Sequence, residues 1–126
     1  MLGDGELQEG SNWEAFMYGA HQGLDNLWAI IDRNTLQQGA RVAETNDLEP
    51  LGDKLRAFGW HVVDIDGHDH LALRAALTTV TEGKPTVLIA HTTKGKGVSF
   101  IEDRAEWHHK IPSADQVAAG REELTR

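Results

Sequence analysis

The chain has 126 residues, which predicts one domain with its own hydrophobic core. It contains no cysteine, and this excludes disulfide frameworks and thiolate metal sites. Twenty acidic against twelve basic residues give a net charge of −8, which disfavours nonspecific binding to nucleic-acid phosphates. No apolar run of membrane-spanning length and no signal-peptide pattern occur, so we expect a cytoplasmic protein that binds neither nucleic acid nor membrane.

The N-terminal segment reads as a glycine-rich turn at residues 3–10, followed by a helix. Apolar side chains after the turn recur at helical spacing, which predicts a helix with one apolar face. These side chains are Trp13, Phe16, Met17, Ala20 and Leu24. Ser11 and Glu14 fit the pattern of a capping box, so we expect Ser11 to cap the start of the helix.

The rest of the chain alternates short apolar runs with helical patterns, which is typical of βαβ units. The predicted strands are residues 27–31, 60–65 and 86–90, and the predicted helices are residues 51–58 and 73–80. We therefore predict an α/β fold in which the strands lie parallel in one sheet with right-handed helical crossovers. Ser113 and Gln116 form a second capping-box pattern, which predicts a short C-terminal helix.

Two long polar segments, residues 35–49 and 91–112, show no periodicity. Irregular segments of this length inside a compact domain are usually functional or ordered by a ligand. Both follow predicted strands, and parallel sheets bind ligands beyond the carboxyl ends of their strands. The glycine turn needs a strand before it, yet only residues 1–2 precede it. We expect either that this strand lies outside the sequence or that the sequence is a piece of a longer chain.

The glycine turn and Asn34 carry oxygen ligands at two predicted strand ends. Gly3 and Gly5 allow close backbone approach to a ligand, and Asp4 offers a carboxylate in the same turn. A carboxylate, an amide oxygen and a backbone carbonyl suit Mg²⁺, which usually also binds substrate phosphates. The alternative is an ordinary turn and an ordinary strand end. A lone turn favours that alternative, whereas the order of strand, turn, helix, strand and Asn34 argues against it.

Longer blocks of the sequence resemble the transketolase family, and the resemblance covers nearly the whole chain. The blocks are GDGELQEGSNWEA, LDNLWAIIDRN, AFGWHVVDIDGHD and HTTKGKGVSFIEDRAEWHHK. The resemblance implies the domain that binds the diphosphate of thiamine diphosphate, with Mg²⁺, Ca²⁺ or Mn²⁺. It also implies transfer of a two-carbon ketol unit between sugar phosphates, as in the pentose phosphate pathway. A pyrimidine-binding partner domain or subunit would complete a homodimer or heterotetramer.

The resemblance also implies roles for matching residues. The metal ligands would be Asp4, Asn34 and the backbone carbonyl of Leu36. The other cofactor-binding residues would be Gly3, Gly5, Glu6, Glu9, Lys94, His108 and Lys110, with Glu9 at an interface between subunits. His108 would be the catalytic residue near the reacting centre. The family commonly has glycine where this chain has His109, so the sequence leaves open which of these two histidines is functional.

Two other functions remain open at this stage. One is a different thiamin-dependent enzyme, such as a deoxyxylulose phosphate synthase, which shares the glycine turn and Asn34. The other is a non-catalytic domain that binds a cofactor or a partner. The sequence does not contain the family's pyrimidine-binding domain, which supplies the glutamate that activates the cofactor, so we expect the isolated chain to be inactive.

Several other polar residues favour plainer interpretations. His68 and His70 lack the spacing of zinc ligands, so we expect a surface loop there. His21 lies near the apolar helix face and is interpreted as a core or interface residue. The charged residues 102–106 are interpreted as solvated charge.

Overall fold

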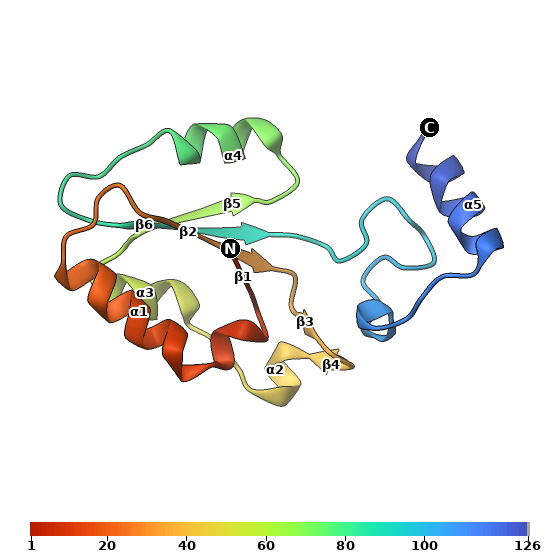
Figure 1. Ribbon diagram of the computed structural model, residues 1–126, viewed down its shortest axis with the longest axis horizontal. Coiled ribbons are helices and arrows are strands. Elements are labelled where there is room, and N and C mark those ends of the chain that lie inside the picture. Colours follow the sequence, from red (N-terminus) through yellow and green to blue (C-terminus); the bar gives the residue numbers. More distant parts are fainter. Residues whose placement is uncertain (126) are drawn as a thin grey trace.

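The computed structural model describes residues 1–125 as a parallel sheet with helices on both faces (Figure 1). The strands of this sheet are β1 (Leu2–Gly3), β2 (Trp28–Arg33), β5 (His61–Asp66) and β6 (Thr86–His91). They lie in the order β1-β2-β6-β5, and every neighbouring pair is parallel. The predicted α/β fold class is therefore confirmed.

The helices and the short second sheet complete the chain. The helices are α1 (Gly10–His21), α2 (Val42–Thr45), α3 (Leu51–Ala57), α4 (His70–Leu77) and α5 (Ala114–Leu124), with 3-10 turns η1 (Glu6–Gln8) and η2 (Ala105–His108). The second sheet pairs β3 (Leu36–Gln37) with β4 (Ala40–Arg41) in antiparallel fashion. Within residues 1–125, none of these helices combines the length and the apolar character needed to cross a membrane.

The core lies between the sheet and the helices α1 and α3, which cover one of its faces, while α4 covers the opposite face (Figure 1). Its buried members are Leu7, Phe16, Ile31, Val42, Leu48, Leu51, Leu55, Trp60, Val87 and Ile89. Residues 86–90 are buried throughout because β6 lies between two strands and has covered faces. This explains why the central strand is a continuous apolar run. The Trp60 indole donates a hydrogen bond of 2.8 Å to the Phe16 carbonyl, which ties α1 to the sheet.

A short β1 is present where we expected the first strand to lie outside the sequence. Leu2 pairs with Ile31, and Gly3 pairs with Asp32. On its other side, β2 pairs with β6, where Arg33 lies next to His91 at the end of β6. Because these strands are parallel, their carboxyl ends meet at the same edge of the sheet. The turn that begins at Asp4 therefore lies beside the segments that follow β2 and β6.

The predicted start of α1 was wrong. The helix begins at Gly10, Glu9 holds the N-cap position, and Ser11 lies inside the first turn without a capping hydrogen bond. The reason is that η1 leads directly into α1, and the Asn12 amide donates to the Glu9 carbonyl. The apolar face is also narrower than predicted, because Met17 and Leu24 are exposed, and His21 is exposed too. The capping box of Ser113 and Gln116 is present at α5 as predicted.

Residues 35–49 were expected to be irregular, yet they contain β3, β4 and α2. The chain reverses through Gln38, which has a positive φ of 38°. The apolar side chains of Leu36, Val42 and Leu48 are buried and anchor this segment to the domain. The sequence pattern missed it because two-residue strands are too short to show a period of two.

Candidate functional site

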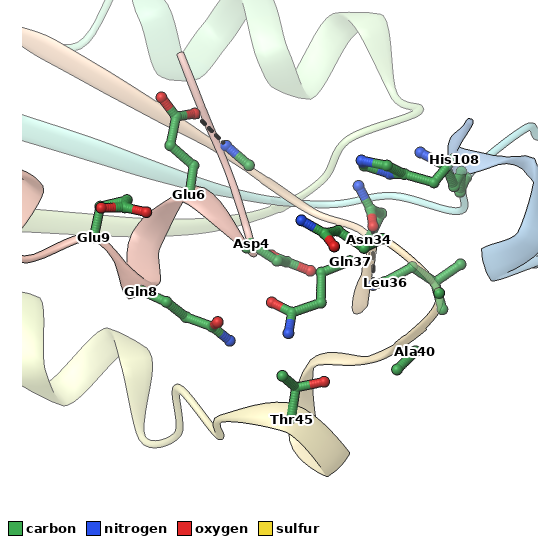
Figure 2. A pocket seen from close by; sticks show the side chains of 15 residues that line it. Asp4, Glu6, Gln8, Glu9, Asn34, Leu36, Gln37, Ala40, Thr45 and His108 are labelled. Atoms are coloured by element: carbon green, nitrogen blue, oxygen red, sulfur yellow. Dashed lines mark hydrogen bonds between the residues drawn. The ribbon is translucent and has the colours of Figure 1, made fainter.

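A pocket of about 850 Å³ lies beyond the carboxyl ends of the strands, where parallel sheets bind ligands (Figure 2). Three segments line it. They contribute Gly3, Asp4, Gly5, Glu6, Gln8 and Glu9 from the N-terminal turn; Asn34, Leu36, Gln37, Gln38, Gly39, Ala40 and Thr45 from the segment after β2; and Lys94 and His108 from the segment after β6. All predicted site residues except Lys110 therefore line this pocket.

Asp4 is the buried carboxylate of the pocket, with 1% of its surface exposed. Its Oδ2 accepts hydrogen bonds from the Arg33 guanidinium, at 3.1 Å, and from the Thr35 amide. Its Oδ1 is also buried but has no hydrogen-bond partner within residues 1–125. Burial raises the pKa of Asp4, and the nearby Arg33 charge partly opposes that rise. An unpaired buried carboxylate oxygen normally implies a missing partner, such as an ion.

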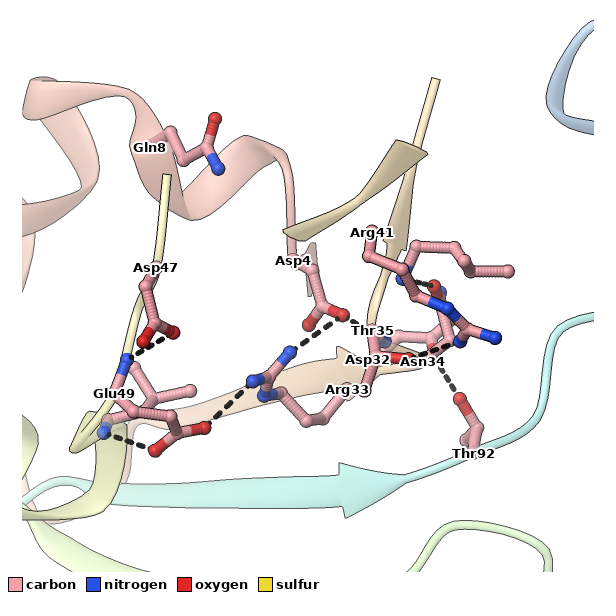
Figure 3. A network of polar contacts seen from close by, with 12 residues as sticks. Asp4, Gln8, Asp32, Arg33, Asn34, Thr35, Arg41, Asp47, Glu49 and Thr92 are labelled. Atoms are coloured by element: carbon pink, nitrogen blue, oxygen red, sulfur yellow. Dashed lines mark hydrogen bonds and ion pairs between the residues drawn. The ribbon is translucent and has the colours of Figure 1, made fainter. Parts of the chain in front are cut away.

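Arg33 is a site residue that the sequence interpretation missed. Its guanidinium bridges Asp4 and Glu49, with Nη2 only 2.7 Å from Glu49 Oε1 (Figure 3). The hydrogen bond from Arg33 lowers the pKa of Glu49, so that carboxylate stays charged at neutral pH. The available signal was a single arginine at the end of an apolar strand, directly before Asn34. Charged side chains are rarely buried unless they are paired.

Asn34 and Leu36 lie opposite the turn that carries Asp4. The Asn34 Oδ1 accepts a hydrogen bond of 3.0 Å from the Leu36 amide, which fixes the direction of the side-chain carbonyl. An amide oxygen has two lone pairs, so this bond leaves one for a cation. Thr35, between them, has a φ of 65°, a conformation that is uncommon for a β-branched residue. The Thr35 amide donates to Asp4 Oδ2.

Lys94 and His108 form the wall of the pocket that comes from the C-terminal segment. Partial desolvation of the ring, and then the charge of Lys94, lower the pKa of His108, which favours the neutral imidazole. The His109 ring packs edge-on to the His108 ring at 4.6 Å and does not belong to the described lining. Lys110 also lies outside the lining, with its Nζ 4.5 Å from the centre of the Trp107 ring.

Side-chain amides make up a further part of the lining that the sequence interpretation missed. Gln8 donates a hydrogen bond of 3.0 Å to the Asn46 carbonyl, and Gln37 lies close to the glycine turn. A Cβ atom added at Gly5 would lie 3.0 Å from the Gln37 Cβ, so a side chain at this position would push Gln37 aside. No sequence signal identified these residues, because glutamine carries no distinctive spacing.

The histidines outside the pocket do not gather into a metal site. Within residues 1–125, no group of three histidine, cysteine, aspartate or glutamate side chains is placed to hold a metal ion. His68 accepts a hydrogen bond of 2.8 Å from the Thr93 amide through Nε2, which occupies that nitrogen. The pocket itself offers one buried carboxylate. This donor set fits Mg²⁺, which usually takes one or two carboxylates and completes its shell with water and phosphate oxygens.

The parallel sheet and the polar pocket beyond its strand ends define a cofactor-binding α/β domain. The sequence profile described as "Transketolase, thiamine diphosphate binding domain" matches residues 1–125. The chain therefore belongs to the transketolase family, in the domain that binds thiamine diphosphate.

Curated relatives agree with this assignment. The chain is 47% identical over 125 residues to a subunit of the apulose-4-phosphate transketolase of Actinobacillus succinogenes, covering 98% of this chain and 45% of the relative. It is 41% identical over 128 residues to the 6-deoxy-6-sulfo-D-fructose transketolase subunit SqwG of a Clostridium species, covering 100% of this chain and 46% of the relative. The chain thus spans about half the length of these relatives.

Solved structures of transketolases share the fold. The enzyme from Campylobacter jejuni superposes with a TM-score of 0.83 at 30% identity, covering 98% of this chain and 20% of that one. A transketolase from Pichia stipitis in complex with sedoheptulose-7-phosphate gives a TM-score of 0.88 at 29% identity, covering 98% of this chain and 19% of that one.

Proposed function

We propose that this chain binds Mg²⁺ and the diphosphate of thiamine diphosphate in its pocket, as one part of a transketolase that transfers a two-carbon ketol unit between sugar phosphates. The observation that carries the proposal is the buried Oδ1 of Asp4, which has no protein partner within residues 1–125 and lies in a glycine turn at the strand ends. Ca²⁺ or Mn²⁺ would bind to the same oxygen donors in place of Mg²⁺.

The metal would be held by Asp4 Oδ1, the second lone pair of Asn34 Oδ1 and the backbone carbonyl of Leu36. Gly3, Gly5 and Glu6 line the turn beside these ligands, and the glycines let a diphosphate approach the backbone closely. The metal offsets the negative charge that the carboxylates of the pocket would otherwise present to a diphosphate.

Lys94 and His108 line the same pocket from the segment after β6. Lys94 supplies a positive charge to phosphate oxygens. His108 is the proposed catalytic residue, because a neutral imidazole can take a proton from a substrate hydroxyl and return it. When bound, the thiamine group supplies the carbanion chemistry that breaks a carbon–carbon bond next to a carbonyl. The protein contributes placement, charge and proton transfer around it.

The chain is proposed to form a homodimer or heterotetramer that includes a second, pyrimidine-binding domain or polypeptide. Two relatives are described as individual subunits of apulose-4-phosphate transketolases, and they support a division of the enzyme between polypeptides. Glu9 lines the pocket and is exposed, so it is available to a partner. The isolated chain is expected to lack ketol-transfer activity, and clear activity of the purified chain alone would contradict this.

The proposed substrates are ketoses with a terminal anionic group. The relatives are named for apulose-4-phosphate and 6-deoxy-6-sulfo-D-fructose, which share that feature and differ in the anion. The residues that would select the anion are expected on the partner. Mixing the chain with a candidate partner and comparing phosphorylated with sulfonated ketose donors would test the substrate class.

Calorimetric titration of thiamine diphosphate, with and without Mg²⁺, tests the cofactor site directly. We expect Mg²⁺-dependent binding in the wild type and its loss in Asp4→Ala and Asn34→Ala. Asp53→Ala serves as a matched control, because Asp53 is an exposed carboxylate on α3 outside the pocket. Binding that is independent of Mg²⁺, or that is unchanged in Asp4→Ala, would contradict the proposed site.

A further inference from the structure

We propose that Arg33 is a positioning residue that sets the metal preference of the pocket, by holding Asp4 so that only one carboxylate oxygen is free to bind a cation. This inference rests on the proposed function, since it concerns the metal that would bind there. Arg33 itself does not line the pocket as described, so it acts through Asp4.

The two oxygens of Asp4 have unequal surroundings. Oδ2 receives two donors, Arg33 Nη1 at 3.1 Å and the Thr35 amide, whereas Oδ1 is buried and receives none within the described chain. Two donors on one oxygen, a side chain at the end of β2 and a backbone amide just after it, oppose rotation of the carboxylate about its bond to the chain. The carboxylate therefore presents Oδ1 alone, and its geometry favours a ligand bound through one oxygen.

Arg33 is itself fixed at both ends. Its side chain is 9% exposed, and its second nitrogen lies 2.7 Å from Glu49 Oε1 (Figure 3). Glu49 is anchored in turn, because its Oε2 accepts a hydrogen bond of 2.9 Å from the Leu51 amide at the start of α3. The chain of contacts runs from α3 through Glu49 and Arg33 to Asp4, so the guanidinium cannot turn away without breaking bonds at both ends.

A carboxylate held in this way discriminates between cations. Mg²⁺ demands near-octahedral ligands at about 2.0–2.1 Å, which suits one oxygen per carboxylate, whereas Ca²⁺ accepts two-oxygen carboxylates at about 2.3–2.6 Å in flexible geometry. If Asp4 were free to rotate, it would offer both oxygens and would suit Ca²⁺ better than it does now. Arg33 therefore favours Mg²⁺ over Ca²⁺ in this pocket.

The test measures Mg²⁺ and Ca²⁺ binding separately, by calorimetry in the presence of thiamine diphosphate, for the wild type and for Arg33→Met. Substitution of residues that orient metal ligands typically weakens metal binding by about 10–100-fold. We expect Mg²⁺ affinity to fall by that amount and Ca²⁺ affinity by about tenfold less. In Arg33→Lys the charge is kept, but the single ammonium group contacts Asp4 or Glu49 and not both. We therefore expect this variant to show a preference for Mg²⁺ between those of the wild type and Arg33→Met.

Glu49→Ala provides a second variant that leaves the contact between Arg33 and Asp4 in place and frees the other end of Arg33. We expect a shift of the same sign and smaller size, which keeps the inference testable if Arg33→Met does not fold. Arg56→Met is the matched control, because Arg56 pairs with Asp53 and Asp64 away from the pocket. It should leave both affinities unchanged.

Equal weakening of both metals in Arg33→Met, or an unchanged ratio of affinities in Glu49→Ala, would overturn the inference, because a merely structural role lowers both affinities together. A wild type that binds Mg²⁺ in the presence of the cofactor, with a ratio that Arg33 variants do not alter, would leave the proposed function standing and reject only this inference. A wild type that binds neither metal would overturn both.

Discussion

Arg41 and Asp103 join the two walls of the pocket through a two-bonded ion pair, although 62 residues separate them in the chain. The guanidinium nitrogens lie 2.8 and 2.6 Å from the two carboxylate oxygens, and Arg41 also donates to the Thr35 hydroxyl. The Asp103 amide donates to the Lys94 carbonyl at 2.9 Å. The segment that carries Lys94 and His108 is thereby held against the segment after β2.

Arg41→Met should lower the stability of the protein in a pH-dependent way. The hydrogen bond from Arg41 lowers the pKa of Asp103 from its ordinary value of 3.8, so the pair contributes above that value and loses its contribution as the pH falls through the folded-state pKa. The difference in free energy of unfolding between wild type and variant should stay constant from about pH 7 to about pH 5 and shrink below about pH 4. Urea denaturation across this range measures it. An equal difference at low and neutral pH would contradict the assignment, and Asp103→Asn should abolish the pH dependence.

Gly95→Ala should destabilise the protein more than Gly83→Ala does. Both glycines have a positive φ, 69° and 70°, so alanine at either costs about 1–2 kcal/mol in backbone strain. Gly95 has an added overlap, because its new Cβ would lie 2.4 Å from the Ile101 Cγ2, whereas Gly83 has open space. Overpacking adds about 1–3 kcal/mol. Urea denaturation compares the two, and equal losses would show that the overlap is relieved without cost.

His108 should titrate below its ordinary pKa of 6.5, because partial desolvation of its ring and the charge of Lys94 disfavour its protonated form. Lys94→Met should raise the pKa of His108, since it removes the neighbouring positive charge. NMR titration of the imidazole protons measures both values. Lys96→Met is the matched control, because Lys96 is exposed and does not line the described pocket. A pKa of His108 that is insensitive to Lys94→Met would show that the two side chains do not interact in solution.

Ser113→Ala should weaken α5 by about 1 kcal/mol, the usual cost of losing an N-cap. The Ser113 hydroxyl accepts a hydrogen bond from the Gln116 amide, and the Ser113 amide donates to the Gln116 side chain. Ser11→Ala is the matched comparison and should be neutral or slightly stabilising, because Ser11 lies inside α1 and alanine is the better helix former. Amide hydrogen exchange in each helix separates the two effects. If Ser11→Ala lowers the exchange protection of α1 as much as Ser113→Ala lowers that of α5, then Ser11 does cap α1.

The sequence predicted the elements whose pattern is imposed by burial. Three of the four strands of the main sheet were predicted from apolar runs, of which β6 is buried because it lies between two other strands, and α5 was predicted from its cap. Asp4 and Asn34 were found because they follow strands at a spacing typical of a known motif. Each of these signals lies within a few neighbouring residues or in a fixed order along the chain.

Such signals in the sequence do not reveal the contacts that hold the pocket together. Arg33 meets Asp4 across 29 residues, and Arg41 meets Asp103 across 62. A charged residue that finds a distant partner looks the same in the sequence as one that faces water, and Asp103 was interpreted in that way. The hairpin of β3 and β4 was missed for a different reason, since its strands have two residues each.

The order of the pocket residues along the chain has a consequence for synthesis on the ribosome. Asp4 is made 104 positions before His108. During translation the contacts of the Asp4 carboxylate form only after Arg33 and Glu49 have been made. The pocket also needs the later segment that carries Lys94 and His108. Parallel pairing of β1, β2 and β6 is also non-local, which slows folding. The pocket is therefore complete only when nearly all of the described residues have left the ribosome.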